Sequence, residues 1–327
     1  MNMKRFTLLL CLAAGLLTMM SSYAPRYNVR IYPYETRHMD FVSQKQAMFM
    51  AYMYEKPAKP NGKTVLLLHG KNFSCSYWGD VMSALLSAGY TVVAPDQIGF
   101  GKSTMPAAYQ YSFQQLAFNT KLLLDSLGVK KTIVLGHSMG GMLAMRFAMM
   151  YPDATEQLIL EDPIGLEDYK QYVPFTTVDD FFKEETMKTR ESVKQYMMKN
   201  YFHDSWRPDY DTLLRESTHE IGTPAFGNYC WSMALTSDMI MNQPVCYELD
   251  KIKAPTVLFI GMLDRTALGK DKVSKDVASK MGDYPSLGKA TAKKIANCQL
   301  IEMQGLGHIP HIEDTPAFLK ELMKVIK

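Results

Sequence analysis

The amino-acid sequence predicts an α/β fold with a mostly parallel central sheet, helices on both faces and an inserted helical cap. Short apolar runs alternate with amphipathic segments along most of the chain, which is typical of parallel sheets covered by helices. The chain has 327 residues, of which 47% are hydrophobic, so it can bury one large core. The alternation stops between residues 165 and 250, where the pattern becomes helical and aromatic.

The N-terminus has the layout of an export signal. Lys4 and Arg5 precede an apolar run at residues 6–20, and small residues follow it. We expect residues 1–24 to be an export signal or an N-terminal membrane anchor. The protein is then periplasmic, secreted or anchored to the membrane. Both alternatives stay open, because Pro25 follows the cleavage position and the apolar run is short for a membrane span.

Residues 25–164 are expected to form the first part of the core. The segment 27–54 predicts two strands of a hairpin, which turn residues at 55–62 close. The alternation of strands and helices then begins. We expect strands at 63–69, 90–94, 132–135 and 157–160, and helices at 77–88, 113–127 and 139–150.

The segment 165–250 is expected to be a helical cap, and residues 251–327 the second part of the core. In that second part we expect strands at 255–260 and 299–303 and helices at 271–281 and 316–326. An insertion between two strands of such a sheet lies above their carboxyl edge, where open α/β sheets bind ligands. The cap should therefore roof the functional site.

Charge and cysteine usage exclude several kinds of partner. The net charge of +3 comes from mixed signs without a basic stripe, so we expect no nucleic-acid partner. The cysteines after the N-terminal segment, Cys75, Cys230, Cys246 and Cys298, lack CxxC or metal-ligand spacing. We expect no metal site and no cofactor. Cys230 and Cys246 could pair in an exported protein, although buried free thiols are commoner.

A nucleophile elbow is the strongest chemical signal. Gly136-His137-Ser138-Met139-Gly140 has the pattern Gly-x-Ser-x-Gly and stands between a predicted strand and a predicted helix. Glycines are needed because larger side chains would collide with the neighbouring strand and helix. We therefore predict that Ser138 is a nucleophile, held in a strained turn with its Oγ exposed to a substrate.

A serine hydroxyl needs a base, and a histidine after the last strand is the expected one. His308 lies in the loop that follows the predicted strand 299–303. His311 is the rival, but it stands directly before the last helix, where packing or hydrogen bonding at the helix start is the simpler role. We predict that His308 is the base.

The base in turn needs a carboxylate that holds its tautomer and stabilises the imidazolium. Asp264 follows the strand after the cap and is our predicted acid. Asp162, at the end of the preceding strand, is the alternative, since it too could reach the histidine.

Two donors should stabilise an oxyanion. We assign the backbone N–H of Met139, at the start of the helix, and that of Lys71, in the loop after the first parallel strand. The Lys71 side chain is expected to be solvated, as most loop lysines are. His69 is expected to hydrogen-bond the backbone of this loop rather than to take part in catalysis.

Together these motifs resemble the α/β-hydrolase superfamily, specifically its capped, esterase-like serine hydrolases. The resemblance rests on His69-Gly70, the loop 96–103, residues 136–141, Asp264 and Gly307-His308, and covers roughly residues 45–327. It implies hydrolysis of a carboxylic ester through an acyl-enzyme, with the triad in the order Ser, Asp, His along the chain. The loop 96–103 either shapes the rim near the nucleophile or is a structural turn.

Other functions on this fold differ at identifiable positions. Haloalkane dehalogenases and epoxide hydrolases carry Asp where this chain has Ser138, which excludes them. Carbon–carbon bond hydrolases typically carry Gly-Pro-Gly after His-Gly and Asn before the nucleophile, whereas this chain has Lys-Asn-Phe at 71–73 and His137. Proline-type aminopeptidases usually have Trp where Met139 stands. A non-catalytic ligand-binding protein is the last alternative, although all three triad positions are filled.

The predicted substrate follows from the side chains around the elbow. Phe73 and Met142, with Met139, are expected to line an apolar cavity under the aromatic cap. Small to medium, largely apolar esters should then be favoured over charged peptides. The physiological ester and the oligomeric state stay open.

Overall fold

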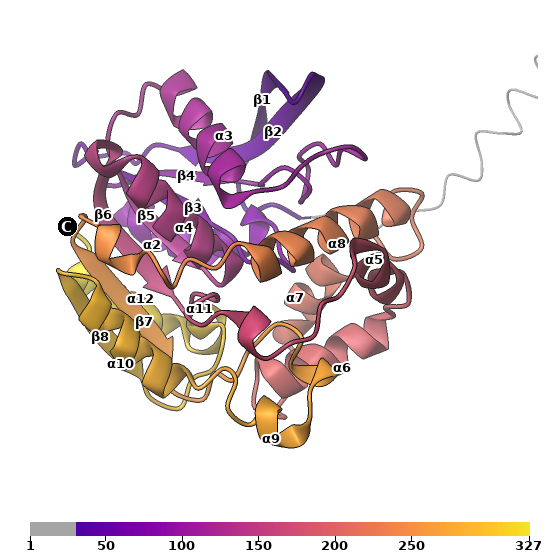
Figure 1. The fold of residues 1–327 in the computed structure, drawn as a ribbon. Helices are drawn as coiled ribbons and strands as arrows, with labels where there is room; N and C mark the ends of the chain where they lie inside the picture. Colours follow the sequence, from indigo (N-terminus) through magenta and orange to yellow (C-terminus); the bar gives the residue numbers. More distant parts are fainter. Residues whose placement is uncertain (1–30) are drawn as a thin grey trace, which may run out of the picture. The chain divides into compact units, whose positions relative to one another are not determined.

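An eight-stranded sheet forms the centre of the structure, a computed structural model that describes residues 31–327 (Figure 1). The strands are β1 Thr36–Ser43, β2 Gln46–Glu55, β3 Thr64–Leu68, β4 Thr91–Pro95, β5 Thr132–His137, β6 Thr155–Glu161, β7 Thr256–Gly261 and β8 Cys298–Met303. The expected export signal or anchor, residues 1–24, lies outside the described residues. Within 31–327, no helix is both long enough and apolar enough to cross a membrane.

The sheet is mostly parallel, which confirms the predicted fold class. Its strand order is β1-β2-β4-β3-β5-β6-β7-β8. β1 and β2 form an antiparallel hairpin, and β2 pairs antiparallel with β4. Every later pair is parallel, so the carboxyl ends of β3, β5, β6, β7 and β8 meet at one edge. Side chains that follow these strands are thereby brought together.

Two apolar cores, one on each face of the sheet, result from the alternation of side chains along the strands. Leu66 and Leu68 of β3 belong to one core, and Val65 and Leu67 to the other. Helices α3 (Phe113–Ser126), α4 (Met139–Met150) and α10 (Tyr284–Lys294) pack in the first core. Helices α2 (Gly79–Ser87) and α12 (Thr315–Val325) pack in the second.

One predicted helix, 271–281, is wrong. That stretch contains only a 3-10 turn at Lys270–Lys272 and the four-residue helix α9, Lys275–Ala278. The helix that joins β7 to β8 on the sheet is α10, which starts later. Gly282 has a φ of +68°, which interrupts helical backbone, and α10 begins directly afterwards with a proline in its first turn. The prediction thus placed this helix too early in the chain, before Gly282 instead of after it.

Four helices lie between β6 and β7 in the segment 165–250, which we call the cap segment. They are α5 Val178–Thr186, α6 Arg190–Asn200, α7 Tyr210–Ser217 and α8 Phe226–Asn242, and Figure 1 shows them gathered together beside the sheet. Threonine caps begin two of these helices. Thr177 accepts from the N–H of Asp180 at the start of α5, and Thr189 forms a capping box with Ser192 at the start of α6.

A buried glutamate holds the loop between β8 and the short helix α11 (Pro310–Glu313). Glu313 accepts hydrogen bonds from the backbone N–H of Gly307, at 3.0 Å, and of Ile309, at 3.0 Å. His308 lies between these two donors. Burial raises the pKa of Glu313 to about 7, in spite of the hydrogen bonds, which act to lower it.

We predict that stability responds to protonation of Glu313. Its pKa is raised on folding, from an ordinary 4.5 to about 7, so the folded state binds this proton more tightly than the unfolded state. The free energy of unfolding should therefore rise as the pH falls through this window, by about 1 kcal/mol per pH unit at most. Glu313→Gln should remove this component, and urea unfolding between about pH 8 and about pH 5 measures it.

The control is Glu184→Gln, which removes a carboxylate exposed on α5. The difference in the free energy of unfolding between wild type and Glu313→Gln should shift in favour of wild type as the pH is lowered. The corresponding difference between wild type and Glu184→Gln should show no such shift. A difference between wild type and Glu313→Gln that is constant across this pH range would contradict the assignment.

Candidate active site

Ser138 occupies a strained turn between β5 and α4. Its φ of +56° and ψ of −119° are rare for a residue with a side chain. A Cβ on Gly136 would overlap the carbonyl of Gly140, and one on Gly140 would overlap the carbonyl of Leu68. The turn is held from β6, since the N–H of Ser138 donates to the carbonyl of Glu161 at 3.1 Å. Only glycine at both flanking positions permits this close approach.

The structure brings Ser138, His308 and Asp264 together, in the arrangement expected from the sequence. His308 Nδ1 lies 2.7 Å from Asp264 Oδ2, and His308 Nε2 lies 3.0 Å from Ser138 Oγ. An ionised carboxylate can only accept, so the proton is on Nδ1, and the lone pair of Nε2 faces the serine hydroxyl. The hydroxyl therefore donates to His308. In this geometry the imidazole can take the serine proton directly.

Asp264 is held in place by the backbone of its own loop. Its second oxygen, Oδ1, accepts the N–H of Thr266 at 2.8 Å, and the side chain is fully buried. Both carboxylate oxygens thus have a donor, one from the backbone and one from His308. This orientation leaves little freedom for the imidazole to turn away.

Asp162, the alternative acid, does not contact His308. Its Oδ1 accepts the N–H of Gly261 at 2.8 Å, and its buried Oδ2 has no hydrogen-bond partner among the described residues. Burial raises the pKa of Asp162 well above its usual value, and the charge of Asp264 adds to the shift. Geometry and charge therefore both favour Asp264 as the partner of the imidazole.

The rival histidine, His311, is committed elsewhere. Its backbone N–H and its Nδ1 both bind the carboxylate of Glu161, at 2.8 and 2.9 Å, and its ring stacks on Trp78 at 4.4 Å between centroids. His69 likewise bonds the backbone, with Nε2 accepting the N–H of Gln97 at 3.0 Å. Neither ring is hydrogen-bonded to Ser138.

Two backbone N–H groups border the serine without an acceptor. A Cβ on Gly70 would lie 3.2 Å from the Cβ of Ser138, which places the loop after β3 against the nucleophile turn. Among the contacts of residues 31–327, the N–H groups of Lys71 and Met139 have no protein acceptor. Met139 also begins α4, whose N-terminal dipole favours negative charge.

The Lys71 side chain is not solvated, contrary to the expectation for a loop lysine. Its Nζ lies 3.0 Å from Glu185 Oε1 of α5, and both side chains are about nine-tenths buried. Burial lowers the pKa of Lys71. Burial acts to raise the pKa of Glu185, but the ammonium groups of Lys71 and Lys188 hold it at about 2. A charged contact thus joins the loop after β3 to the cap segment.

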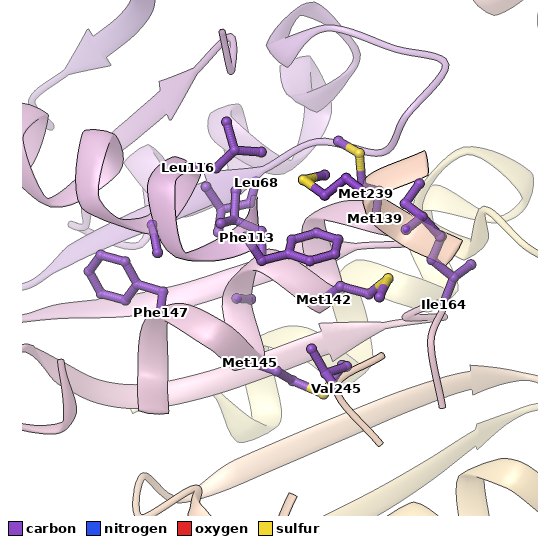
Figure 2. Packing of buried hydrophobic residues seen from close by; sticks show 14 of the residues in the cluster. Leu68, Phe113, Leu116, Met139, Met142, Met145, Phe147, Ile164, Met239 and Val245 are labelled. Atoms are coloured by element: carbon purple, nitrogen blue, oxygen red, sulfur yellow. The ribbon is translucent and has the colours of Figure 1, made fainter. Parts of the chain in front are cut away.

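The residues predicted to line the substrate cavity are packed against protein. Phe73 stacks on Tyr77, with ring centroids 5.0 Å apart. Met142 is fully buried in the core that Figure 2 shows, and a Cβ on Gly165 would lie 2.6 Å from its Cε. Met139 is also fully buried there. The surroundings of the elbow are therefore apolar, and the lining roles of Phe73 and Met142 stay a prediction.

Tyr201, in the cap segment, is a neighbour of His308 that the sequence did not single out. The two rings stack at 4.9 Å between centroids, the N–H of His308 donates to the carbonyl of Tyr201 at 3.4 Å, and Asn72 Nδ2 donates to the Tyr201 hydroxyl at 2.7 Å. Ser138 is left 7% exposed and His308 1%. Tyr201 is one of many aromatic residues in the segment, and nothing local marks it out.

Two surface hollows lie at the opposite edge of the sheet. One is lined by residues at the start of β6, including Pro152 and Glu156, and the other by residues at the start of β7 and the C-terminus. They are remote from the carboxyl ends of the strands, where ligands bind in such sheets.

Neither a disulfide nor a metal site is found in the described part of the chain. Cys230 and Cys246 are separate thiols, so the alternative disulfide between them is not made. Residues 31–327 contain no group of three or more His, Cys, Asp and Glu side chains placed to hold a metal ion.

Known proteins are similar to this chain in sequence and in fold. A family model described as the alpha/beta hydrolase fold matches residues 63–203. The crystal structure of a probable hydrolytic enzyme from Pseudomonas aeruginosa PAO1 is 44% identical, with a TM-score of 0.91, and the match covers 94% of this chain and 100% of that one. The enol-lactonase of Burkholderia xenovorans LB400 shares the fold at 19% identity, with a TM-score of 0.67 over 85% of this chain and 96% of that one.

Curated relatives match over shorter lengths. The 2-hydroxy-6-oxo-6-phenylhexa-2,4-dienoate hydrolase of Burkholderia cepacia is 31% identical over 208 residues, which cover 62% of this chain and 72% of that protein. An uncharacterized protein of Mycobacterium tuberculosis is 38% identical over 106 residues, which cover 32% of this chain and only 30% of its own length. Fold and relatives agree with the resemblance seen in the motifs: the chain belongs to the α/β-hydrolase family.

Proposed function

We propose that this protein is a serine hydrolase that cleaves small to medium, largely apolar carboxylic esters through an acyl-enzyme on Ser138. The observation that carries the proposal is the hydrogen-bond chain from Ser138 Oγ through His308 to Asp264, with distances of 3.0 and 2.7 Å. Such a chain activates a serine hydroxyl that is otherwise a weak nucleophile at neutral pH.

The contacts support a reaction in two steps, acylation of Ser138 and then hydrolysis of the acyl-enzyme. Ser138 Oγ attacks the ester carbonyl carbon while His308 Nε2 takes the hydroxyl proton, and Asp264 stabilises the imidazolium. In this proposal, the N–H groups of Lys71 and Met139 stabilise the negative oxygen of the tetrahedral intermediate. The imidazolium then protonates the departing alcohol. In the second step, water attacks the acyl-enzyme by the same route and releases the acid.

The choice of an apolar ester rests on the surroundings of the elbow. Met139 and Met142 lie in the first turns of α4, directly after the serine. Ile164 and Met239 belong to the same apolar core (Figure 2). Methionine side chains adapt to irregular shapes, which suits acyl groups of different form. We expect the acyl group to be held among these side chains, under the cap segment.

Carbon–carbon bond hydrolysis is the second candidate, favoured by the names of relatives such as the dienoate hydrolase of Burkholderia cepacia. The chain departs from the pattern typical of those enzymes at two places. It has Lys-Asn-Phe at 71–73 and His137 before the nucleophile, and the Lys71 side chain is engaged by Glu185. These differences favour the ester.

We predict a limited acyl-length profile. With aryl esters of increasing acyl length, kcat/KM should rise by about threefold to fourfold per carbon, because burying one methylene is worth about 0.8 kcal/mol, and should fall once the pocket is full. A vinylogous 1,5-diketone, assayed beside them, should be a poor substrate. Ser138→Ala is the control and should abolish turnover of every ester. A preference for the diketone would move the function to carbon–carbon hydrolysis, and a steady rise to long-chain lipids would refute an enclosed pocket.

A matched pair of substitutions tests the acid. Asp264→Asn should lower kcat by about 10⁴, because an amide at this position favours the wrong imidazole tautomer. Asp162→Asn is nearly isosteric and keeps an oxygen for the N–H of Gly261, so its effect on ester turnover should be mild. The reverse ranking, measured in the same assay, would move the acid to Asp162.

A further inference from the structure

A chain of buried hydrogen bonds runs beneath the candidate site. The backbone N–H of Gly70 donates to the hydroxyl of Tyr77 at 2.9 Å, and that hydroxyl lies 2.9 Å from His137 Nδ1. The other ring nitrogen, His137 Nε2, lies 2.8 Å from the backbone carbonyl of His308. Each of these side chains is at most 9% exposed.

The direction of each hydrogen bond is determined by its partners. The carbonyl of His308 can only accept, so the proton is on His137 Nε2. In a neutral imidazole, Nδ1 is then an acceptor and the Tyr77 hydroxyl must donate to it. The hydroxyl oxygen is left to accept the N–H of Gly70. With a neutral ring at His137, all three contacts are made and the hydroxyl proton of Tyr77 is used as well.

The surroundings keep both groups in the required form. Burial, with the neighbouring rings of His308 and His311, lowers the pKa of His137 well below its usual value. Burial raises the pKa of Tyr77, so its hydroxyl keeps its proton. Phe73 stacks on the Tyr77 ring, and the His311 ring lies nearly perpendicular to it with centroids 4.8 Å apart, which limits rotation of the phenol.

This series of hydrogen bonds connects the loops that carry the groups of the proposed mechanism. Gly70 directly precedes Lys71, whose N–H has no protein acceptor among the described residues and is left for an oxyanion. His137 directly precedes Ser138, and its ring holds the main chain of the base. A single imidazole thus connects the nucleophile turn, the loop after β3 and the loop of His308.

We propose that Tyr77 and His137 are positioning residues that hold the Lys71 N–H and the His308 imidazole in place relative to Ser138. This proposal rests on the proposed function, because it assigns Lys71 and His308 their roles in ester cleavage. Neither residue touches the reacting atoms. Their effect should be on the rate of the chemical step rather than on substrate binding.

The test is Tyr77→Phe, which keeps the ring and removes only the hydroxyl. Tyr109→Phe is the matched control, because Tyr109 is a buried tyrosine whose hydroxyl accepts from Asn119 Nδ2 at 2.9 Å, outside this chain of contacts. Both variants lose one buried hydroxyl and should melt at similar temperatures. Tyr77→Phe alone should lower kcat, by about tenfold to a hundredfold, with KM within about twofold, since one misplaced oxyanion donor costs about this much or more.

The second readout is the rate at which a fluorophosphonate modifies Ser138, which requires no knowledge of the natural substrate. It should fall in parallel with kcat in Tyr77→Phe and stay near wild type in Tyr109→Phe. His137→Gln, which keeps an N–H for the carbonyl of His308, should react faster than His137→Leu. If wild type reacts at Ser138 and Tyr77→Phe matches the control, the positioning proposal fails alone. If wild type does not react at Ser138, the proposed function fails and the positioning role fails with it.

Discussion

The candidate active site depends on one histidine, His308. Its side chain is almost completely buried, yet one of its ring nitrogens is directed at Ser138. His308 is 1% exposed, and each polar atom of its ring and backbone has a partner. Asp264 fixes the tautomer, Tyr201 covers the ring, and Glu313 binds the N–H groups on either side of it. A buried polar group without such partners would cost several kcal/mol and would turn or titrate instead.

The parts of the site that the sequence predicts are those whose signal is local. The elbow around Ser138 needs a strand, two glycines and a helix in immediate succession, and all of these can be read from a few residues. His308 and Asp264 follow strands of the sheet, and parallel topology brings the ends of neighbouring strands together. Alternation of short apolar runs with helices predicts the fold class for the same reason, since each run is long enough to be recognised by itself.

The contacts that the sequence did not predict join segments far apart in the chain. Lys71 was expected to be solvated, but Glu185 lies more than a hundred residues away, and no local pattern marks the pair. Tyr201 and Tyr77 look like ordinary core aromatics until the fold places them against histidines. The helix α10 was missed for a different reason: the stretch before it has a similar apolar pattern, and the positive φ of Gly282 decides where the helix begins.

The position of a covalent adduct tests whether this arrangement activates one serine hydroxyl. The folded protein should be treated with a fluorophosphonate, and the modified residue located by mass spectrometry of its peptides. We expect a single adduct on the peptide that contains Ser138 and no adduct in Ser138→Ala. A folded wild-type protein that takes up no label, or takes it up at another residue in both proteins, would show that the Ser138 hydroxyl is not activated.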